Sequence, residues 1–134
     1  MSVRMKIIAN IVVCGLAILA LPLSSLANAK GVAKNTTGLP TYPKETSSIM
    51  DAQPRDWRGH QCTHYASSSD DPLATVESWY RKELPGAKEA PVNADAQYGP
   101  FKLDGIKFSH GVDVVNVYRM QGQKDTAIEL FKCR

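Results

Sequence analysis

The stretch Asp71–Gly86, DPLATVESWYRKELPG, decides the expected fold because it carries the signals of one amphipathic helix. Asp71 is a favourable N-cap, and Pro72 suits the first helical position. Apolar residues then recur at helical spacing on one face: Leu73, Val76, Trp79, Tyr80 and Leu84. Pro85 and Gly86 end the helix. A helix that carries a Trp and a Tyr on one face gains most by burying that face against a sheet.

Strand patterns lie on both sides of this helix. Before it, Trp57–Ser67 has the Thr, Tyr and Cys content of a strand, and a short strand is expected near Ser48–Ala52. After a loop-like stretch from 87 to 100, Asp104-Gly105 predicts a two-residue turn between Phe101–Leu103 and Ile106–Phe108. The sequence therefore predicts a hairpin over residues 101–108.

The last quarter of the chain predicts a second hairpin. Val112–Met120 and Thr126–Cys133 are strand-like, and Gln121–Asp125 is a loop of Gly and polar residues. Apolar residues on both sides of 112–120 indicate a central strand. We therefore expect an α+β domain in which one main amphipathic helix packs on an antiparallel sheet of about four to six strands.

The N-terminal region has the composition of an export signal. Arg4 and Lys6 precede the apolar run Ile7–Leu21, and Ala27-Asn28-Ala29 is a small-x-small cleavage site. The apolar run is shorter than the roughly 20 residues that cross a bilayer. We therefore expect residues 1–29 to be a signal peptide that is removed on export to the periplasm or the medium, which leaves no membrane span. The alternative is an uncleaved membrane anchor.

Removal of this leader would leave about a hundred residues, enough for one domain. Residues 30–48 are polar and contain Pro40 and Pro43, so a flexible N-terminal lead is expected there, followed by a single α+β domain over 49–134. The leader holds two of the 16 basic residues and none of the 13 acidic ones, so the mature net charge would be +1. A near-neutral domain without a basic run gives no electrostatic case for nucleic-acid binding.

Two cysteines would remain after cleavage, Cys62 and Cys133. In an oxidising compartment they are expected to form one intramolecular disulfide. It would close a loop of about 70 residues and contribute roughly 4 kcal/mol in the chain-entropy model. The alternatives are free thiols or an intermolecular bridge.

His60, Cys62 and His64 alternate along the expected strand, so their side chains would share one face. These residue types bind zinc or copper, and His110 could add a ligand. A disulfide sulfur is no thiolate ligand, so the metal site and the Cys62–Cys133 bridge exclude each other. Two imidazoles seldom make a tight site. No metal or other cofactor is therefore expected, and a metal-binding protein that uses His60 and His64 is the alternative.

Catalytic patterns are weak in this sequence. A Cys62 nucleophile would be lost when the disulfide forms. Serines 67–69 and Asp70 are explained by helix capping rather than by a Ser–His–Asp triad with His64. No catalytic residue is therefore predicted, and a small hydrolase or isomerase is the third interpretation. Trp57 and Arg58 form a candidate recognition patch, because Trp and Arg are favoured at interfaces. The alternative is that Trp57 closes the end of the core.

The stretch Tyr65–Ala87, YASSSDDPLATVESWYRKELPGA, resembles small exported bacterial proteins of unassigned function. In these proteins an aspartate-capped helix carries Val, then Trp-Tyr or Phe-Tyr, and ends near Leu-Pro-Gly. The resemblance covers about a fifth of the mature chain. It implies an α+β domain and brings no catalytic residues. The sequence as a whole favours a non-enzymatic exported binding module that recognises a protein or an envelope component.

Overall fold

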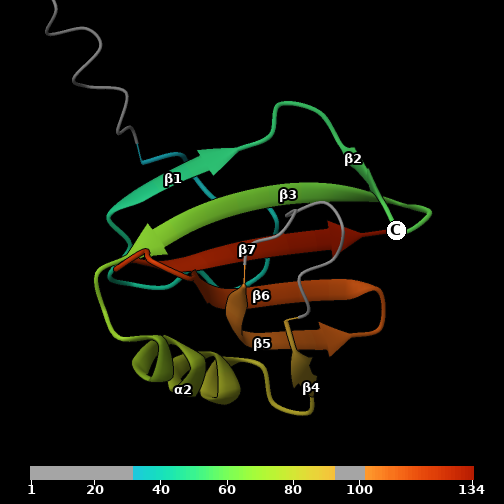
Figure 1. Ribbon diagram of the computed structural model, residues 1–134. Coiled ribbons are helices and arrows are strands. Elements are labelled where there is room, and N and C mark those ends of the chain that lie inside the picture. The colour runs from blue at the N-terminus through green and yellow to red at the C-terminus, as the bar shows by residue number, and fades with distance from the viewer. Residues whose placement is uncertain (1–31, 93–101) are drawn as a thin grey trace, which may run out of the picture.

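The computed structural model describes residues 32–92 and 102–134, which form a seven-stranded antiparallel sheet and one helix (Figure 1). The elements are β1 (Ser47–Met50), β2 (Arg55–Trp57), β3 (His60–Ser69), α2 (Leu73–Glu83), β4 (Lys88–Pro91), β5 (Leu103–His110), β6 (Asp113–Met120) and β7 (Thr126–Cys133). The strand order is β1-β3-β7-β6-β5-β4, and β2 pairs with the part of β3 that β1 does not reach. The expected signal peptide lies outside the described residues.

The expected α+β architecture, with one main amphipathic helix on a sheet of four to six strands, is wrong. The sheet has seven strands, whereas α2 spans 11 residues and buries only Val76 and Tyr80. Leu73, Trp79 and Leu84 were expected on the same buried face and are only partly buried at the edge of the core. The strands supply six of the nine buried residues of the main core, whereas α2 supplies two and the segment before β1 supplies one.

The main core lies on one face of the central strands. Side chains two residues apart in a strand point to the same face, so each strand contributes alternate residues. The buried members are Tyr65 from β3, Ile128 and Leu130 from β7, Val115 and Val117 from β6, Phe108 from β5, Val76 and Tyr80 from α2, and Tyr42 from the segment before β1. In Figure 1, α2 lies beside the β5–β6 half of the sheet. β6 is a central strand, as its apolar residues on both faces predicted.

The two predicted hairpins have different outcomes. β6 and β7 pair antiparallel across the loop that the sequence predicted. The predicted turn at Asp104-Gly105 is wrong, because β5 runs straight through both residues and pairs with β6 along its length. A Cβ at position 105 would lie 2.1 Å from the carbonyl oxygen of Val117, so only glycine allows this close approach of the two strands. Phe101 lies outside the described residues.

A turn divides the strand that was expected over Trp57–Ser67. Arg58 and Gly59 both have positive φ, at 52° and 80°, which is the backbone of a type I′ turn. Asp56 supports the turn by accepting a hydrogen bond from the Gly59 amide. The turn separates β2 from β3, and β3 continues to Ser69. β4 likewise occupies part of the stretch that was expected to be a loop.

The segment 32–46, expected to belong to a flexible lead, lies against the core. Tyr42 is 3% exposed, and Ser69 Oγ donates a hydrogen bond to the Lys44 carbonyl at 2.9 Å. Three tyrosine hydroxyl bonds join this segment to the domain: Tyr80 to the Pro40 carbonyl, Tyr65 to the Glu45 carboxylate, and Tyr42 to the Asp71 carboxylate. The segment is therefore held by hydroxyl groups from β3 and α2, by the hydroxyl of its own Tyr42, and by burial of the Tyr42 ring in the core.

Candidate functional site

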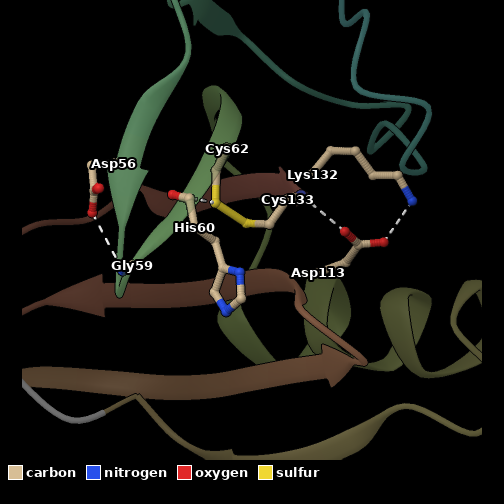
Figure 2. The surroundings of a disulfide bond; sticks show 7 residues. All are labelled: Asp56, Gly59, His60, Cys62, Asp113, Lys132 and Cys133. Carbon is tan, nitrogen blue, oxygen red and sulfur yellow. Dashed lines mark hydrogen bonds and ion pairs between the residues drawn. A yellow bond between two sulfur atoms is a disulfide. The ribbon is translucent and has the colours of Figure 1, made fainter.

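Cys62 and Cys133 face each other across β3 and β7, with their sulfur atoms 1.97 Å apart (Figure 2). Both are buried, at 0% and 8% exposed. Asp113 accepts hydrogen bonds from the Cys133 amide and from Lys132 Nζ beside the bridge. The last strand is therefore fastened to the sheet by a cysteine pair at disulfide distance and by the Asp113 carboxylate, an arrangement consistent with an exported protein.

Trp57 covers this end of the molecule. Its ring stacks on Phe131 with centroids 4.4 Å apart, and its side chain belongs to a small cluster with Cys62 and Cys133. Trp57 is 8% exposed, so it packs as the end of a core and presents little surface to a partner. The Arg58 guanidinium lies 5.6 Å from the centre of the Trp57 ring. Of the predicted recognition patch, only Arg58 is exposed.

His64 is buried between two carboxylates. Nδ1 lies 3.1 Å from Asp51 Oδ2, and Nε2 lies 3.3 Å from Glu129 Oε1. The ring also stacks on Phe131 at 4.5 Å, and Asp51 pairs with Arg55 at 2.8 Å. Because both ring nitrogens face carboxylate oxygens, neither is directed toward a metal ion or a substrate. The imidazole therefore connects the loop after β1 to β7.

The other predicted ligand, His60, is exposed, and so is His110 at the end of β5. Within residues 32–92 and 102–134, no group of three or more His, Cys, Asp or Glu could hold a metal ion. The metal-binding alternative with His60 and His64 stays a prediction, and no observation of the structure favours it.

The serines before the helix do not meet His64. Ser68 Oγ lies 2.6 Å from Ser47 Oγ, and Ser69 Oγ donates to the Lys44 carbonyl. Ser67 alternates with His64 and so lies on the other face of β3. Asp71, predicted to cap the helix, instead accepts the hydroxyl of Tyr42, and the helix forms no side-chain cap hydrogen bond.

A groove of about 570 Å³ runs between α2 and the segment 42–44. One wall consists of Tyr42, Pro43 and Lys44, and the other is the outer face of α2 from Ala74 to Lys82. Residues four apart lie on one helical face, so Ala74, Ser78 and Lys82 form a row along this wall. The small side chains of Ala74 and Ser78 leave the groove open. Its volume lies within the roughly 300–1,000 Å³ that is typical of ligand pockets.

The groove combines an aromatic wall with positive charge. Trp79 packs edge-on against Tyr42, with ring centroids 5.3 Å apart, and edge-on against Tyr80 at 4.8 Å. Burial, reinforced by the hydrogen bond to Asp71, raises the pKa of Tyr42 to about 12, so its hydroxyl stays a neutral donor. Lys44 and Lys82 line the groove, and no acidic residue does. Among the described residues, neither lysine forms an ion pair.

No protein-family model, curated protein or solved structure matches this chain. A functional assignment therefore depends on the geometry of the groove. Among the described residues, no helix is both long and apolar enough to cross a membrane.

The groove was not predicted from the sequence. Its two walls come from residues about thirty positions apart, and the segment that carries Tyr42 resembled a flexible lead. One signal was available: Ala74, Thr75 and Ser78 form a small-residue face on a helix that also carries Trp79.

Proposed function

We propose that this chain is a non-enzymatic exported binding module that recognises a protein or an envelope component through the groove between α2 and residues 42–44. The observation that carries this proposal is the open groove itself, whose lining includes Tyr42 and Trp79 together with two lysines and no acidic residue. Exposed lysines beside a fixed aromatic ring allow recognition through both charge and apolar contact.

The walls of the groove support binding because they are held in place by the fold. Tyr42 is fixed by its hydrogen bond to Asp71 and by its edge-on contact with Trp79. Tyr80 packs edge-on against Trp79 on the core side, and its hydroxyl donates a hydrogen bond to the Pro40 carbonyl at 3.1 Å. A site that is formed before its ligand arrives loses less conformational entropy on binding.

A binding role also suits the way in which the titratable groups are used. His64 is enclosed by Asp51 and Glu129, and Asp71 is occupied by Tyr42. These groups hold elements of the fold together. For export to the periplasm or the medium, the support is the leader composition of residues 1–29 together with the Cys62–Cys133 pair.

The test is capture of a partner from envelope extract by the immobilised mature protein. Ser78→Tyr fills the groove, whereas Glu83→Tyr places the same residue on an exposed position of α2 outside it. We expect Ser78→Tyr to reduce the amount of captured partner at least about tenfold. Glu83→Tyr should capture as much partner as the wild type. If the wild-type protein captures nothing, or if both variants capture as much as the wild type, the proposal is wrong.

A further inference from the structure

We infer that the groove binds an acidic peptide segment of a partner protein. This inference rests on the proposed function, since it names the chemistry of what the groove would recognise. The reason is charge complementarity: each wall contributes one exposed lysine, Lys44 from the segment before β1 and Lys82 from the last turn of α2. Carboxylates placed between the two walls would meet both ammonium groups, while an adjacent apolar side chain packs on Trp79 and Pro43.

The dimensions of the groove suit a short extended peptide. Ala74 to Lys82 spans about 12 Å along the helix axis at 1.5 Å per residue. About four residues of extended chain cover the same length at 3.3 Å per residue. The hydroxyls of Thr75 and Ser78 line this path and could donate hydrogen bonds to peptide carbonyls.

Other anionic ligands suit the groove less well. Peripheral membrane binding through anionic lipids is typical of clusters of roughly four to eight basic residues, and only two lysines line the groove. An acidic glycan presents many hydroxyl groups, which planar amide and carboxylate side chains bind in pairs. The lining contains no Asn, Gln, Asp or Glu. A peptide needs only the carboxylate, carbonyl and apolar contacts that the groove offers.

The inference is tested by fluorescence anisotropy with a labelled hexapeptide of alternating Glu and Leu, compared with the same peptide carrying Gln for Glu. We expect the Glu peptide to bind at least about tenfold more tightly than the Gln peptide, with the difference reduced by salt. Lys44→Glu combined with Lys82→Glu should abolish the preference for the Glu peptide over the Gln peptide. Lys88→Glu combined with Lys124→Glu changes the net charge equally at exposed positions outside the groove and should preserve it.

The outcomes separate this inference from the proposed function. If a partner is captured in a groove-dependent way but Lys44→Glu with Lys82→Glu leaves capture unchanged, the function stands and the acidic peptide is wrong. The inference is also overturned if the Glu and Gln peptides bind equally, or if polygalacturonate or phosphatidylglycerol vesicles bind through the two lysines while the Glu peptide does not. An intact mass that shows the disulfide and an unchanged thermal midpoint establish that the charge variants are folded.

Discussion

At the scale of single residues, His64 shows how one side chain joins three parts of the fold. It lies on β3, contacts Asp51 in the loop after β1, and contacts Glu129 on β7. Its ring and that of Trp57 both stack on Phe131. An alternating His-x-Cys-x-His pattern suggested metal ligands, whereas in the fold His64 bonds two carboxylates, Cys62 pairs with Cys133 and His60 is exposed.

Replacing His64 is expected to be costly. His64→Leu removes the buried imidazole that bonds Asp51 and Glu129, and the loss of hydrogen bonds at a buried polar group costs about 1–3 kcal/mol. His60→Leu, on the same strand but exposed, should change the free energy of unfolding by less than about 0.5 kcal/mol. Urea denaturation of both variants measures the difference. Equal stabilities of the two variants would contradict a role for the Asp51–His64–Glu129 contacts.

Gly105 makes a second prediction at this scale. Gly105→Ala would place a Cβ 2.1 Å from the Val117 carbonyl oxygen and 2.6 Å from Tyr118 Cα, so β5 and β6 must separate. Overpacking of this kind destabilises by about 1–3 kcal/mol. Ser109→Ala, four residues along the same strand, is the control and should have a much smaller effect. The thermal midpoints of the two variants decide the matter, and a neutral Gly105→Ala would mean that the strands are not this close.

At the scale of elements, the sequence predicted correctly those strands and loops that are set by residues close together in the chain. The β6–β7 hairpin was predictable because alternation and a Gly-containing polar loop both occur within 21 residues. Asp104-Gly105 was misread because a turn and a close strand approach require the same residue. The segment 32–46 could not be predicted to pack, since its attachment depends on hydroxyl groups from residues 65 and 80 far along the chain.

These tyrosines predict how the protein responds to alkali. Burial is the main reason that the pKa of Tyr42 and of Tyr65 is raised to about 12, and it also raises the pKa of Tyr80. In the unfolded chain tyrosine ionises near pH 10. Between about pH 10 and 12 the folded state therefore holds more protons than the unfolded state, and stability falls as pH rises. Below pH 10 this contribution is complete.

Tyr65→Phe tests this mechanism directly. The variant loses the hydrogen bond to Glu45, which costs about 1 kcal/mol at pH 8. Because phenylalanine does not ionise, the gap between wild type and variant should narrow as pH rises from about 10 toward 12. Urea midpoints at pH 8, 10 and 11.5 provide the comparison. A gap that stays constant with pH would show that Tyr65 is not protected from ionisation in the fold.

Glu77 on α2 predicts a loss of stability with rising pH of the same sign as for the tyrosines, but in the acidic range. Burial, with Asp104 and Glu89 nearby, raises its pKa despite the favourable charge of Arg81. The ionised carboxylate therefore opposes folding at neutral pH, and protonation relieves this cost. Glu77→Gln should raise the urea midpoint at pH 7 but match the wild type near pH 4, where the carboxyl is largely protonated in both states. Glu83→Gln, exposed on the same helix, should show no such pH-dependent gain.

At the scale of the whole molecule, the β3–β7 pair connects everything else. β1 and β2 pair with the outer side of β3, while β6, β5 and β4 follow on the other side of β7. The Cys62–Cys133 pair lies at one end of these two strands. At the other end Ser69 and Thr126 donate to the carbonyls of Lys44 and Asp71, beside the groove.

Loss of the cysteine pair should affect the stability of the entire domain. The two residues are 71 positions apart in sequence. Closing a loop of that length restricts the unfolded chain by about 4 kcal/mol in the entropy model, so Cys62→Ala with Cys133→Ala should lose that much stability. Urea denaturation measures the loss, and wild-type protein with reductant should show a similar one. Intact mass with alkylation verifies the bridge, and two free thiols without reductant would contradict it.

The groove could not be predicted from the sequence, because it depends on how two distant segments pack in the folded molecule. Trp79 and Lys82 were visible as helix residues, but Tyr42 and Lys44 join them only because the leading segment folds back along α2. No local period or motif encodes such a juxtaposition. It follows from the tyrosine hydroxyl bonds, which become apparent only once the sheet is assembled.

The length of the β3–β7 pair has a practical consequence for tethering the protein. Arg134 follows directly on the cysteine-pair end, and eight residues of strand at about 3.4 Å each put it roughly 27 Å from the groove end of the strands (Figure 1). A bead or fusion partner coupled after Arg134 would therefore leave the walls around Trp79 open to solvent. Amine-reactive coupling would instead modify Lys44 and Lys82 and block the surface being studied.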